Sequence, residues 1–304
     1  MWFWGGWGVQ CDDEFPDGAF PDDEFVQAVR QWWPSNARDL PWRHTRDPWA
    51  ILVSEIMAQQ TQVGRVVPSW RQFLERFPTP ADAAEAPSGD LVAMWSGLGY
   101  NRRAILLHRC AVEITERHRG LVPRELAELL ELPGVGPYTA RAVLAFAFER
   151  DVAVVDTNVG RVLARVQGAT LSGQTVQLLA DSLVPPGRGW EWNQAILDFG
   201  AMICSKKAPG CEICPVREVC GWVGVGDDPA VGSASVSTSQ SAFFGSDRQG
   251  RGRLVSALRS GDVHERDAAR VMGWEDDQAR TQRVVETLIS DGLVVRIGAS
   301  LVLP

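Results

Sequence analysis

Four of the six cysteines are the residues whose spacing points most directly to chemistry. They fall within seventeen residues, whereas Cys11 and Cys110 stand apart. We expect a cytoplasmic chain, because the N-terminus lacks the basic start and the long apolar stretch of a signal peptide. In that reducing compartment clustered thiols indicate a metal site rather than a disulfide framework. The clustered thiols belong to Cys204, Cys211, Cys214 and Cys220.

A glycine-rich turn between two predicted helices is the second candidate for chemistry. Residues 132–140 read Leu-Pro-Gly-Val-Gly-Pro-Tyr-Thr-Ala, and Gly134 and Gly136 let the backbone turn tightly with N–H groups facing outward. The helix that follows adds its N-terminal dipole and its unpaired N–H groups, which suit a DNA phosphate. Taken alone, the same pattern also fits a turn without a ligand.

Two carboxylates occur in settings that could support acid–base chemistry. Glu55 lies in a helical segment with isoleucine, leucine and methionine on both sides, where a carboxylate is costly unless it has a function or a partner. Asp156 immediately precedes a predicted helix, in Val-Val-Asp-Thr-Asn-Val. A surface glutamate and a helix-capping aspartate are the alternatives that involve no chemistry.

In chain order, the Leu-Pro-Gly-Val-Gly-x-x-Thr-Ala hairpin, the aspartate before a helix and the Cys-x6-Cys-x2-Cys-x5-Cys run resemble the helix-hairpin-helix superfamily of DNA glycosylases, which includes endonuclease III. Residues 47–63, where a glutamate precedes a Gln-Gln-Thr-Gln run, resemble the A/G-specific adenine glycosylase branch. The resemblance covers roughly residues 23–222. It implies a mainly α fold: a six-helix barrel with an iron–sulfur cluster domain.

The resemblance also implies cofactors. In that superfamily four thiolates hold a [4Fe–4S] cluster, which the four clustered cysteines would bind here. Structural zinc also accepts four cysteines and is the alternative. The only lysines of the chain, Lys206 and Lys207, lie in the same loop and suit a phosphate. A monovalent cation at the hairpin of residues 132–140 is a further ligand that the resemblance allows.

Cleavage of a purine N-glycosidic bond needs a protonated leaving base and a stabilised cationic sugar, for which two carboxylates in different environments suffice. By resemblance, Glu55 is the acid, and we predict that its apolar surroundings keep it protonated until it transfers the proton to N7 of adenine. Asp156 stays ionised and stabilises the sugar, supported by Asn158. Lyase-active relatives carry a lysine where this chain has Tyr138, so we expect base release without strand cleavage.

Adenine must leave the duplex to reach these groups. The resemblance implies that Gln59, Gln60 and Tyr100 fill the space that the base vacates. The residues implied for the base pocket are Trp42, Arg43 and Gln194.

Helical periodicity predicts the scaffold that must position these residues. No alternating strand pattern competes with it before residue 204. The helices predicted in this region are Asp22–Trp33, Ala50–Gln62, Pro68–Arg76, Asp90–Ser96, Arg102–His118, Arg124–Leu130, Thr139–Phe148, Asn158–Val166 and Trp192–Cys204.

We expect four segments: an unstructured tail at 1–22, the catalytic region at 23–222 with the cluster loop at 204–220, a polar linker at 223–242, and a small domain at 243–304. The last domain is predicted as three helices and a hairpin, the order of a winged helix-turn-helix. Small packing modules have the same order, so DNA contact and scaffolding both stay open. Its predicted helices are Arg251–Ser260, Glu265–Met272 and Asp276–Asp291.

Charge and length limit the partners. The formal net charge of −8 disfavours nucleic acid mildly, although a local basic patch would suffice. No run of about 18 apolar residues predicts a membrane span. We expect a monomer that acts on double-stranded DNA and has no membrane partner.

The predicted function is a monofunctional base-excision glycosylase that removes adenine mispaired with 8-oxoguanine or guanine. Adenine glycosylases usually carry a further domain that inspects 8-oxoguanine, and the residues after the linker are too few for it. The preferred opposite base therefore stays open. The alternatives are a mismatch thymine glycosylase of the same superfamily and an iron–sulfur, redox-sensing DNA-binding regulator.

Overall fold

The computed structural model describes residues 22–234, 236 and 242–304, which belong to two compact units. Unit 1 comprises Met1–Arg38 and Asp151–Thr238, and unit 2 comprises Asp39–Arg150 and Ser239–Pro304. The described residues are mainly helical, which confirms the predicted fold class. The catalytic region predicted at 23–222 is thus shared between the units. Of the predicted tail, only Asp22 lies within the described residues, where it begins the first helix.

The first part of unit 2 is a succession of helices whose starts are set by local capping. Asp47 accepts a hydrogen bond from the backbone N–H of Trp49 at 3.0 Å, and Pro48 occupies the first turn of α2. Thr79 and Asp82 form a capping box at the start of α4. α2 packs on α3 and α8, and α4 packs on α6. The elements are η2 (Pro41–His44), α2 (Pro48–Ala58), α3 (Val63–Arg76), α4 (Pro80–Glu85), α5 (Ser88–Met94), α6 (Arg102–Arg117), α7 (Leu126–Glu131) and α8 (Pro137–Ala147).

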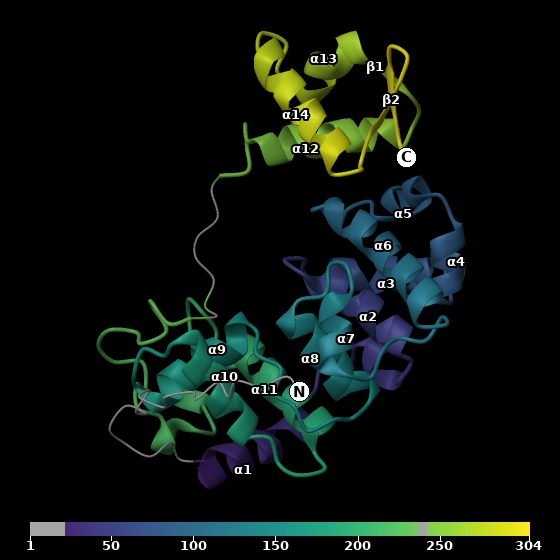
Figure 1. Cartoon of the computed structure of the whole chain (residues 1–304). Helices are drawn as coiled ribbons and strands as arrows, with labels where there is room; N and C mark the ends of the chain where they lie inside the picture. Colours follow the sequence, from purple (N-terminus) through teal and green to yellow (C-terminus); the bar gives the residue numbers. More distant parts are fainter. Residues whose placement is uncertain (1–21, 235, 237–241) are drawn as a thin grey trace, which may run out of the picture. The chain divides into compact units, whose positions relative to one another are not determined.

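The C-terminal part of unit 2 combines helices with a small antiparallel sheet, in the predicted order (Figure 1). β3 lies between β1 and β2, with Val263 opposite Leu301 and Ile297 opposite Ser300. The sequence does not predict β1, because its two residues are too few to alternate. The elements are α12 (Asp247–Leu258), β1 (Val263–His264), η5 (Glu265–Asp267), α13 (Ala268–Met272), α14 (Gln278–Ser290), β2 (Val295–Ile297) and β3 (Ser300–Val302).

Hydrogen bonds hold this C-terminal part against α5 and α6. Arg259 donates to the carbonyl oxygen of Val92 from Nε at 3.1 Å and from Nη2 at 3.0 Å, and Nη2 also reaches Oδ1 of Asn101 at 3.3 Å. The N–H of Gly89 donates to the carbonyl oxygen of Pro304 at 2.8 Å, which places the C-terminus beside α5 (Figure 1).

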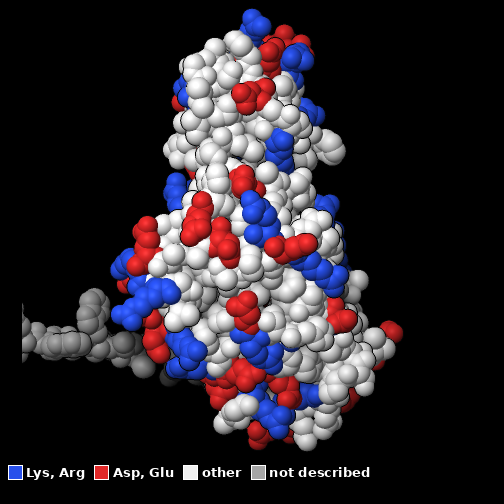
Figure 2. Space-filling model, turned by 90° about the vertical axis from the view of Figure 1, so that its right-hand side faces the viewer, with Lys and Arg blue, Asp and Glu red and all other residues white. Residues whose placement is uncertain are grey.

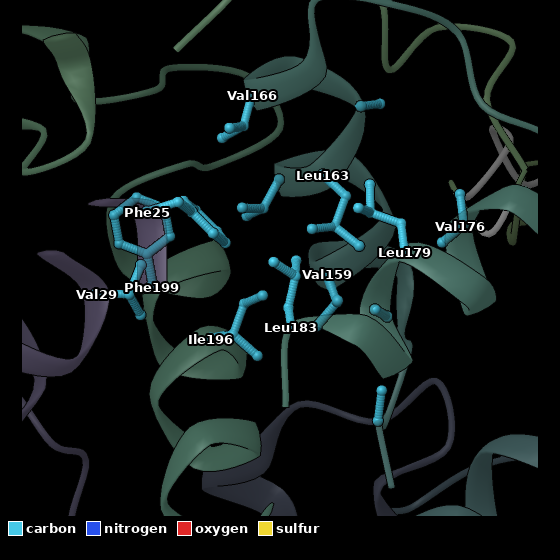
Figure 3. Packing of buried hydrophobic residues seen from close by; sticks show 14 of the residues in the cluster. Phe25, Val29, Val159, Leu163, Val166, Val176, Leu179, Leu183, Ile196 and Phe199 are labelled. Carbon is cyan, nitrogen blue, oxygen red and sulfur yellow. The ribbon is translucent and has the colours of Figure 1, made fainter. Parts of the chain in front are cut away.

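One hydrophobic core holds unit 1 together (Figure 3). Leu163 of α9 and Phe199 of α11 are fully buried in it. Phe25 of α1 contacts Trp192 edge-on, with ring centroids 5.9 Å apart. This packing fixes α9 and with it the residue that begins the helix, Asp156. The elements are α1 (Asp22–Trp32), η1 (Trp33–Ser35), α9 (Thr157–Gln167), α10 (Gly173–Ser182), α11 (Gly189–Met202), η3 (Cys211–Ile213) and η4 (Arg217–Val219).

The predicted helices occur, with corrections at their ends. α2 ends at Ala58, so its predicted continuation to Gln62 is wrong, because Gln60 takes a left-handed φ of 55° that a helix cannot contain. α3 already begins at Val63 and contains Pro68, the predicted start. The sequence prediction misses α4 and α10: the first has only six residues, too few to show a helical period.

Part of the segment predicted as a linker packs on unit 1. Asp228 accepts hydrogen bonds from Nε and Nη2 of Arg165 at 3.0 and 2.7 Å, and Ala230 is buried. The N–H of Ala234 donates to the carbonyl oxygen of Leu171 at 2.9 Å. The predicted linker at 223–242 is therefore anchored over 228–234, while 235 and 237–241 lie outside the described residues.

The surface carries both signs of charge side by side. On the face in Figure 2, arginines and lysines are interspersed with aspartates and glutamates. In the part of the chain that the structure describes, none of the helices is both long and apolar enough for a membrane span.

Candidate active site and cysteine pocket

Glu55 lies on the most deeply buried stretch of α2. The helix is buried from Trp49 to Met57, and Glu55 itself is 8% exposed. The residues one turn before and one position after it, Leu52 and Ile56, are 0% and 1% exposed. This burial argues against the surface alternative.

The turn after α2 presents Gln59 and Gln60, and a buried arginine of α6 holds it. Arg103 is 7% exposed. Its Nη1 donates to the carbonyl oxygens of Ile56, Met57 and Gln59 at 2.8, 2.8 and 2.6 Å. These carbonyls belong to the end of α2, so the guanidinium supplies the donors that the carbonyls of a helix end lack.

The same guanidinium holds the loop that carries Tyr100. Nη2 of Arg103 donates to the carbonyl oxygens of Leu98 and Gly99 at 3.0 and 2.9 Å, and to Oγ1 of Thr61 at 2.9 Å. Burial lowers the pKa of Arg103 to about 10, which still leaves it charged at neutral pH. Tyr100 has a φ of 47° and is 41% exposed. One arginine thus fixes both segments predicted to enter the DNA duplex.

The glycine-rich hairpin joins α7 to α8 in the predicted way. Gly134 has a φ of 82°, and a Cβ there would lie 2.9 Å from Cβ of Leu106. Gly134 therefore meets two demands that only glycine satisfies, a left-handed backbone and a close approach. Gly136 begins α8 in an extended conformation, followed by Pro137 in the first turn.

The first turn of α8 touches the Gln59–Gln60 turn. Tyr138 is half-buried there. Thr139 is 2% exposed, and its Oγ1 accepts a hydrogen bond from Nε2 of Gln59 at 3.3 Å. Within unit 2, the hairpin and the two glutamines are therefore neighbours.

Trp42 and Arg43 lie in η2 and pack toward α2. Trp42 meets Trp70 edge-on, with ring centroids 5.8 Å apart, and Nε1 of Trp70 donates to the carbonyl oxygen of Ala50 at 2.7 Å. Arg43 is 8% exposed. Both side chains are thus partly covered by packing within the protein, whether or not they also line a base pocket.

In unit 1, Asp156 caps α9 and is held on both oxygens. Oδ1 accepts from the backbone N–H groups of Asn158 and Val159 at 2.8 Å each, and Oδ2 accepts from Nδ2 of Asn158 at 2.7 Å. The predicted support of Asp156 by Asn158 is thus present as a contact. Arg161 continues the chain of contacts: Nη2 donates to Oδ1 of Asn158 at 2.8 Å, and Nε donates to the carbonyl oxygen of Cys204 at 2.8 Å.

Burial raises the pKa of Asp156 above its usual value, because the protein replaces water around the carboxylate. The hydrogen bonds from Val159 and Asn158 and the charge of Arg161 act in the opposite direction. Asp156 therefore is the N-cap of α9, but it is desolvated, which a solvent-exposed N-cap residue would not be. The carboxylate is thus both capped by hydrogen bonds and desolvated.

Gln194 is 5% exposed on α11, and its neighbour Asn193 is 1% exposed. Oδ1 of Asn193 accepts from the N–H of Val154 at 2.7 Å, and Nδ2 donates to the carbonyl oxygen of Val152 at 2.8 Å. These bonds fix the extended segment that leads to Asp156.

The four clustered cysteines line one pocket of unit 1. Sγ of Cys204 accepts a hydrogen bond from Nη1 of Arg165, and the thiol of Cys220 donates to the carbonyl oxygen of Arg165, both at 3.4 Å. The pKa of Cys214 is raised to about 11, mainly by burial and also by the charges of the other three cysteines, while a backbone hydrogen bond from Val216 acts in the opposite direction. The sulfur atoms are thus close enough to influence one another.

Comparison with known proteins identifies the family. Residues 53–186 match the HhH-GPD superfamily of base excision DNA repair proteins. An adenine DNA glycosylase of Mycobacterium tuberculosis is 40% identical over 276 residues, which cover 87% of this chain and 88% of that protein. The chain belongs to the adenine DNA glycosylase family.

Solved structures support the same fold for this glycosylase. A thermostable thymine-DNA glycosylase is 34% identical with a TM-score of 0.62, and the match covers 66% of this chain and 94% of the other. A trapped endonuclease III–DNA covalent intermediate is 25% identical with a TM-score of 0.59, covering 64% and 92%. The predicted superfamily and the predicted enzyme class, a DNA glycosylase of base excision repair, are confirmed.

The predicted site residues fall on both units. Glu55 and Asp156 belong to different units, so each is described with its own surroundings. Unit 2 brings together the residues around the α2 turn and the hairpin. Unit 1 brings together the second carboxylate and the cysteine loop. In unit 2 lie Trp42, Arg43, Glu55, Gln59, Gln60, Tyr100, Gly134, Gly136 and Tyr138, and in unit 1 lie Asp156, Asn158, Gln194, Cys204, Lys206, Lys207, Cys211, Cys214 and Cys220.

The four thiols that line the cysteine pocket are the donor set that a [4Fe–4S] cluster takes. A [4Fe–4S] cluster offers one iron to each thiolate, so its ligands surround a volume rather than a point. All four cysteines line one pocket here, together with apolar side chains such as Ile203 and Val216. Over the described residues, no three His, Cys, Asp or Glu side chains surround one ion position. The two lysines of the loop, Lys206 and Lys207, are exposed beside it.

Three arginines that contact the predicted site segments escape the sequence prediction: Arg103, Arg161 and Arg165. Arg165 is 1% exposed, and its Nε and Nη2 form a bidentate ion pair with the carboxylate of Asp228. Its Nη1 donates to the carbonyl oxygen of Ser205 at 2.8 Å. A usable signal exists, since each is followed directly by an apolar residue of its helix. The argument that a charge among apolar residues needs a partner applies equally to them.

Proposed function

We propose that this glycosylase hydrolyses the N-glycosidic bond of adenine in a mispair in double-stranded DNA. The observation that carries the proposal is Glu55, a buried carboxylate on α2 that lies one turn before the Gln59–Gln60 turn. The adenine DNA glycosylase named above supports adenine as the base, and the endonuclease III–DNA complex supports DNA as the partner.

Glu55 would act as the general acid. In its protonated form it would transfer a proton to N7 of the flipped adenine. The protonated base then leaves with the electron pair of the glycosidic bond, and water completes the hydrolysis at the sugar carbon. Glu55, now ionised, accepts a proton from that water.

Asp156 would stabilise the positive charge that develops on the sugar. A carboxylate whose desolvation raises its pKa gains most when a cation arrives beside it, because the cation replaces the lost hydration. Asn158 keeps the carboxylate oriented through Oδ2. Arg161 orients Asn158 in turn.

Base release without strand cleavage follows from the hairpin. Tyr138 stands where lyase-active relatives carry a lysine, and a phenol cannot form a Schiff base with the sugar. The two lysines of the chain, Lys206 and Lys207, belong to the cysteine loop, where they would contact a DNA phosphate.

Cys204, Cys211, Cys214 and Cys220 would hold a [4Fe–4S] cluster, as the shared pocket supports. When bound, such a cluster supplies four iron–thiolate bonds that cross-link the loop, and a centre capable of one-electron transfer. Arg165 would then donate to a thiolate rather than to a thiol through its contact with Cys204.

The test is single-turnover base release from duplexes with adenine opposite 8-oxoguanine, adenine opposite guanine, and thymine opposite guanine. We expect adenine release, lowered about 10²- to 10⁴-fold by Glu55→Gln and also strongly by Asp156→Asn. Strand breaks should appear only after alkali. Glu75→Gln on the exposed side of α3 is the matched control and should release adenine at the wild-type rate.

A second candidate is thymine release from a G mispair, favoured by the likeness to the thymine-DNA glycosylase structure. Release of thymine but not adenine by the wild type would replace the proposal with this candidate. If no duplex loses a base, the enzymatic proposal fails for these bases, and a DNA-binding regulator becomes the hypothesis to pursue.

A further inference from the structure

A pocket of about 730 Å³ lies in unit 2 where α12 faces the turn after α2 and the start of α6. One wall contains Gln59, Gln60 and Tyr100. The other contains Phe243, just before α12, and two residues of its first turns, Arg248 and Arg251. The pocket therefore joins the predicted duplex-entering residues to the C-terminal domain.

The lining is positively charged in a chain whose formal net charge is −8. Arg102, Arg248 and Arg251 contribute guanidinium groups, and the only carboxylate of the lining belongs to Asp291, which is ion-paired with Arg251 and lies 3.5 Å from Arg102. Nη1 of Arg248 donates to the hydroxyl oxygen of Tyr100 at 3.2 Å. An anion is thus the ligand that this pocket favours.

Exposed aromatic rings accompany the arginines. Phe243 is 53% exposed and Tyr100 is 41% exposed, although both line the pocket. Phe243 also meets Phe244 edge-on, with ring centroids 6.1 Å apart, and Phe244 is 86% exposed. Arginines for a phosphate beside aromatic rings for a base are the combination that binds unpaired nucleotides.

The helix that a winged-helix protein usually inserts into the major groove is α14, and its charges oppose that use. Glu275, Asp276 and Asp277 precede it directly. On its exposed side Arg283 is paired with Asp247 at 2.9 Å, and Glu286 accepts from Arg296 at 2.6 Å. The acidic residues that precede the N-terminus of α14 would repel DNA phosphates.

We propose that α12, rather than α14, is the DNA-contacting helix of the C-terminal domain, and that the pocket receives an unpaired nucleotide. Its phosphate lies at Arg248 and Arg251, and its base stacks on Tyr100 and Phe243. The inference rests on the proposed function in one respect: removing adenine from the stack leaves the opposite nucleotide without a partner, and that nucleotide is the occupant.

The test compares the affinity of the full chain for two duplexes of one sequence at one salt concentration. One carries an abasic-site analogue opposite guanine, and the other is fully paired. Arg248→Ala and Phe243→Ala should weaken binding of the abasic duplex about tenfold and that of the paired duplex less than about threefold. Arg283→Ala on α14 is the matched control and should change neither affinity.

Equal losses on both duplexes, or none on the abasic duplex, would overturn the inference. So would a selective loss with Arg283→Ala alone, since it assigns the contact to α14. Both pocket residues are partly exposed, and thermal melts of each variant exclude a folding defect. Binding is scored on DNA that contains no adenine at the site, so adenine release by the wild type tests the proposed function separately.

Discussion

At the scale of single residues, Asp156 combines two opposed effects. It caps α9 through three hydrogen bonds, which stabilise the ionised form, yet burial outweighs them and raises its pKa. A folded-state pKa above the unfolded value means that the fold favours the protonated acid. The stability that this group contributes is therefore full at low pH and is lost as the pH rises through the folded pKa.

Asp156→Asn should accordingly raise the free energy of unfolding at pH 7 to 8, because asparagine keeps the cap and removes the buried charge. The gain should shrink as the pH is lowered toward 3.8, the ordinary aspartate value. Urea midpoints of the two proteins across this range measure it. A variant that is less stable than the wild type at pH 7 would show that the hydrogen bonds of the carboxylate outweigh its desolvation.

At the scale of elements, the hairpin depends on two glycines for different reasons. Gly134 has a left-handed φ, and an added Cβ would lie 2.9 Å from Leu106, whereas Gly136 has an ordinary φ of −97° and no atom within 4 Å of such a Cβ. Gly134→Ala should thus lower the free energy of unfolding by about 1–3 kcal/mol, and Gly136→Ala by less than about 1 kcal/mol. Chemical denaturation of the two variants measures these free energies, and equal losses in both variants would contradict the argument from backbone strain.

Arg103 connects three elements, since its guanidinium serves the end of α2, the turn after it and the loop before α6. Arg103→Met leaves those buried carbonyls without a donor, so we expect a loss of about 3 kcal/mol in the free energy of unfolding and at least a roughly tenfold fall in adenine release. Arg117→Met, on the same helix but exposed, is the control and should change neither. A stable Arg103→Met with normal release would mean that the turn forms without it.

The sequence predicts the elements that carry a period or a motif, such as α6, α8 and the hairpin. It fails where a long-range partner decides the backbone. The helix predicted to Gln62 stops at Ala58, where Gln60 turns out of the helical conformation and Arg103, which is distant in sequence, donates to the carbonyl oxygen of Met57. Likewise Asp228 lies in a polar, glycine-rich stretch, and only the fold reveals Arg165 as its partner. The local sequence pattern does not predict contacts between residues that are distant in sequence.

At the scale of the whole molecule, each unit is assembled from segments distant in sequence, and unit 2 depends on its C-terminal part. Half-buried Arg259 links the end of α12 to α5 and the start of α6 through hydrogen bonds to Val92 and Asn101, and burial lowers its pKa. Loss of this side chain should therefore loosen one unit while the other stays unchanged.

Arg259→Ala should make backbone amides of α5, the start of α6 and α12 exchange hydrogen about thirtyfold faster, which corresponds to about 2 kcal/mol in local opening. Amides of α9 and α11 should keep their wild-type rates, because they belong to unit 1. Hydrogen exchange followed by mass spectrometry measures both, with Arg270→Ala on the exposed side of α13 as control. Faster exchange spread evenly over both units would mean that the chain opens as one cooperative body, and the division into units would not describe its energetics.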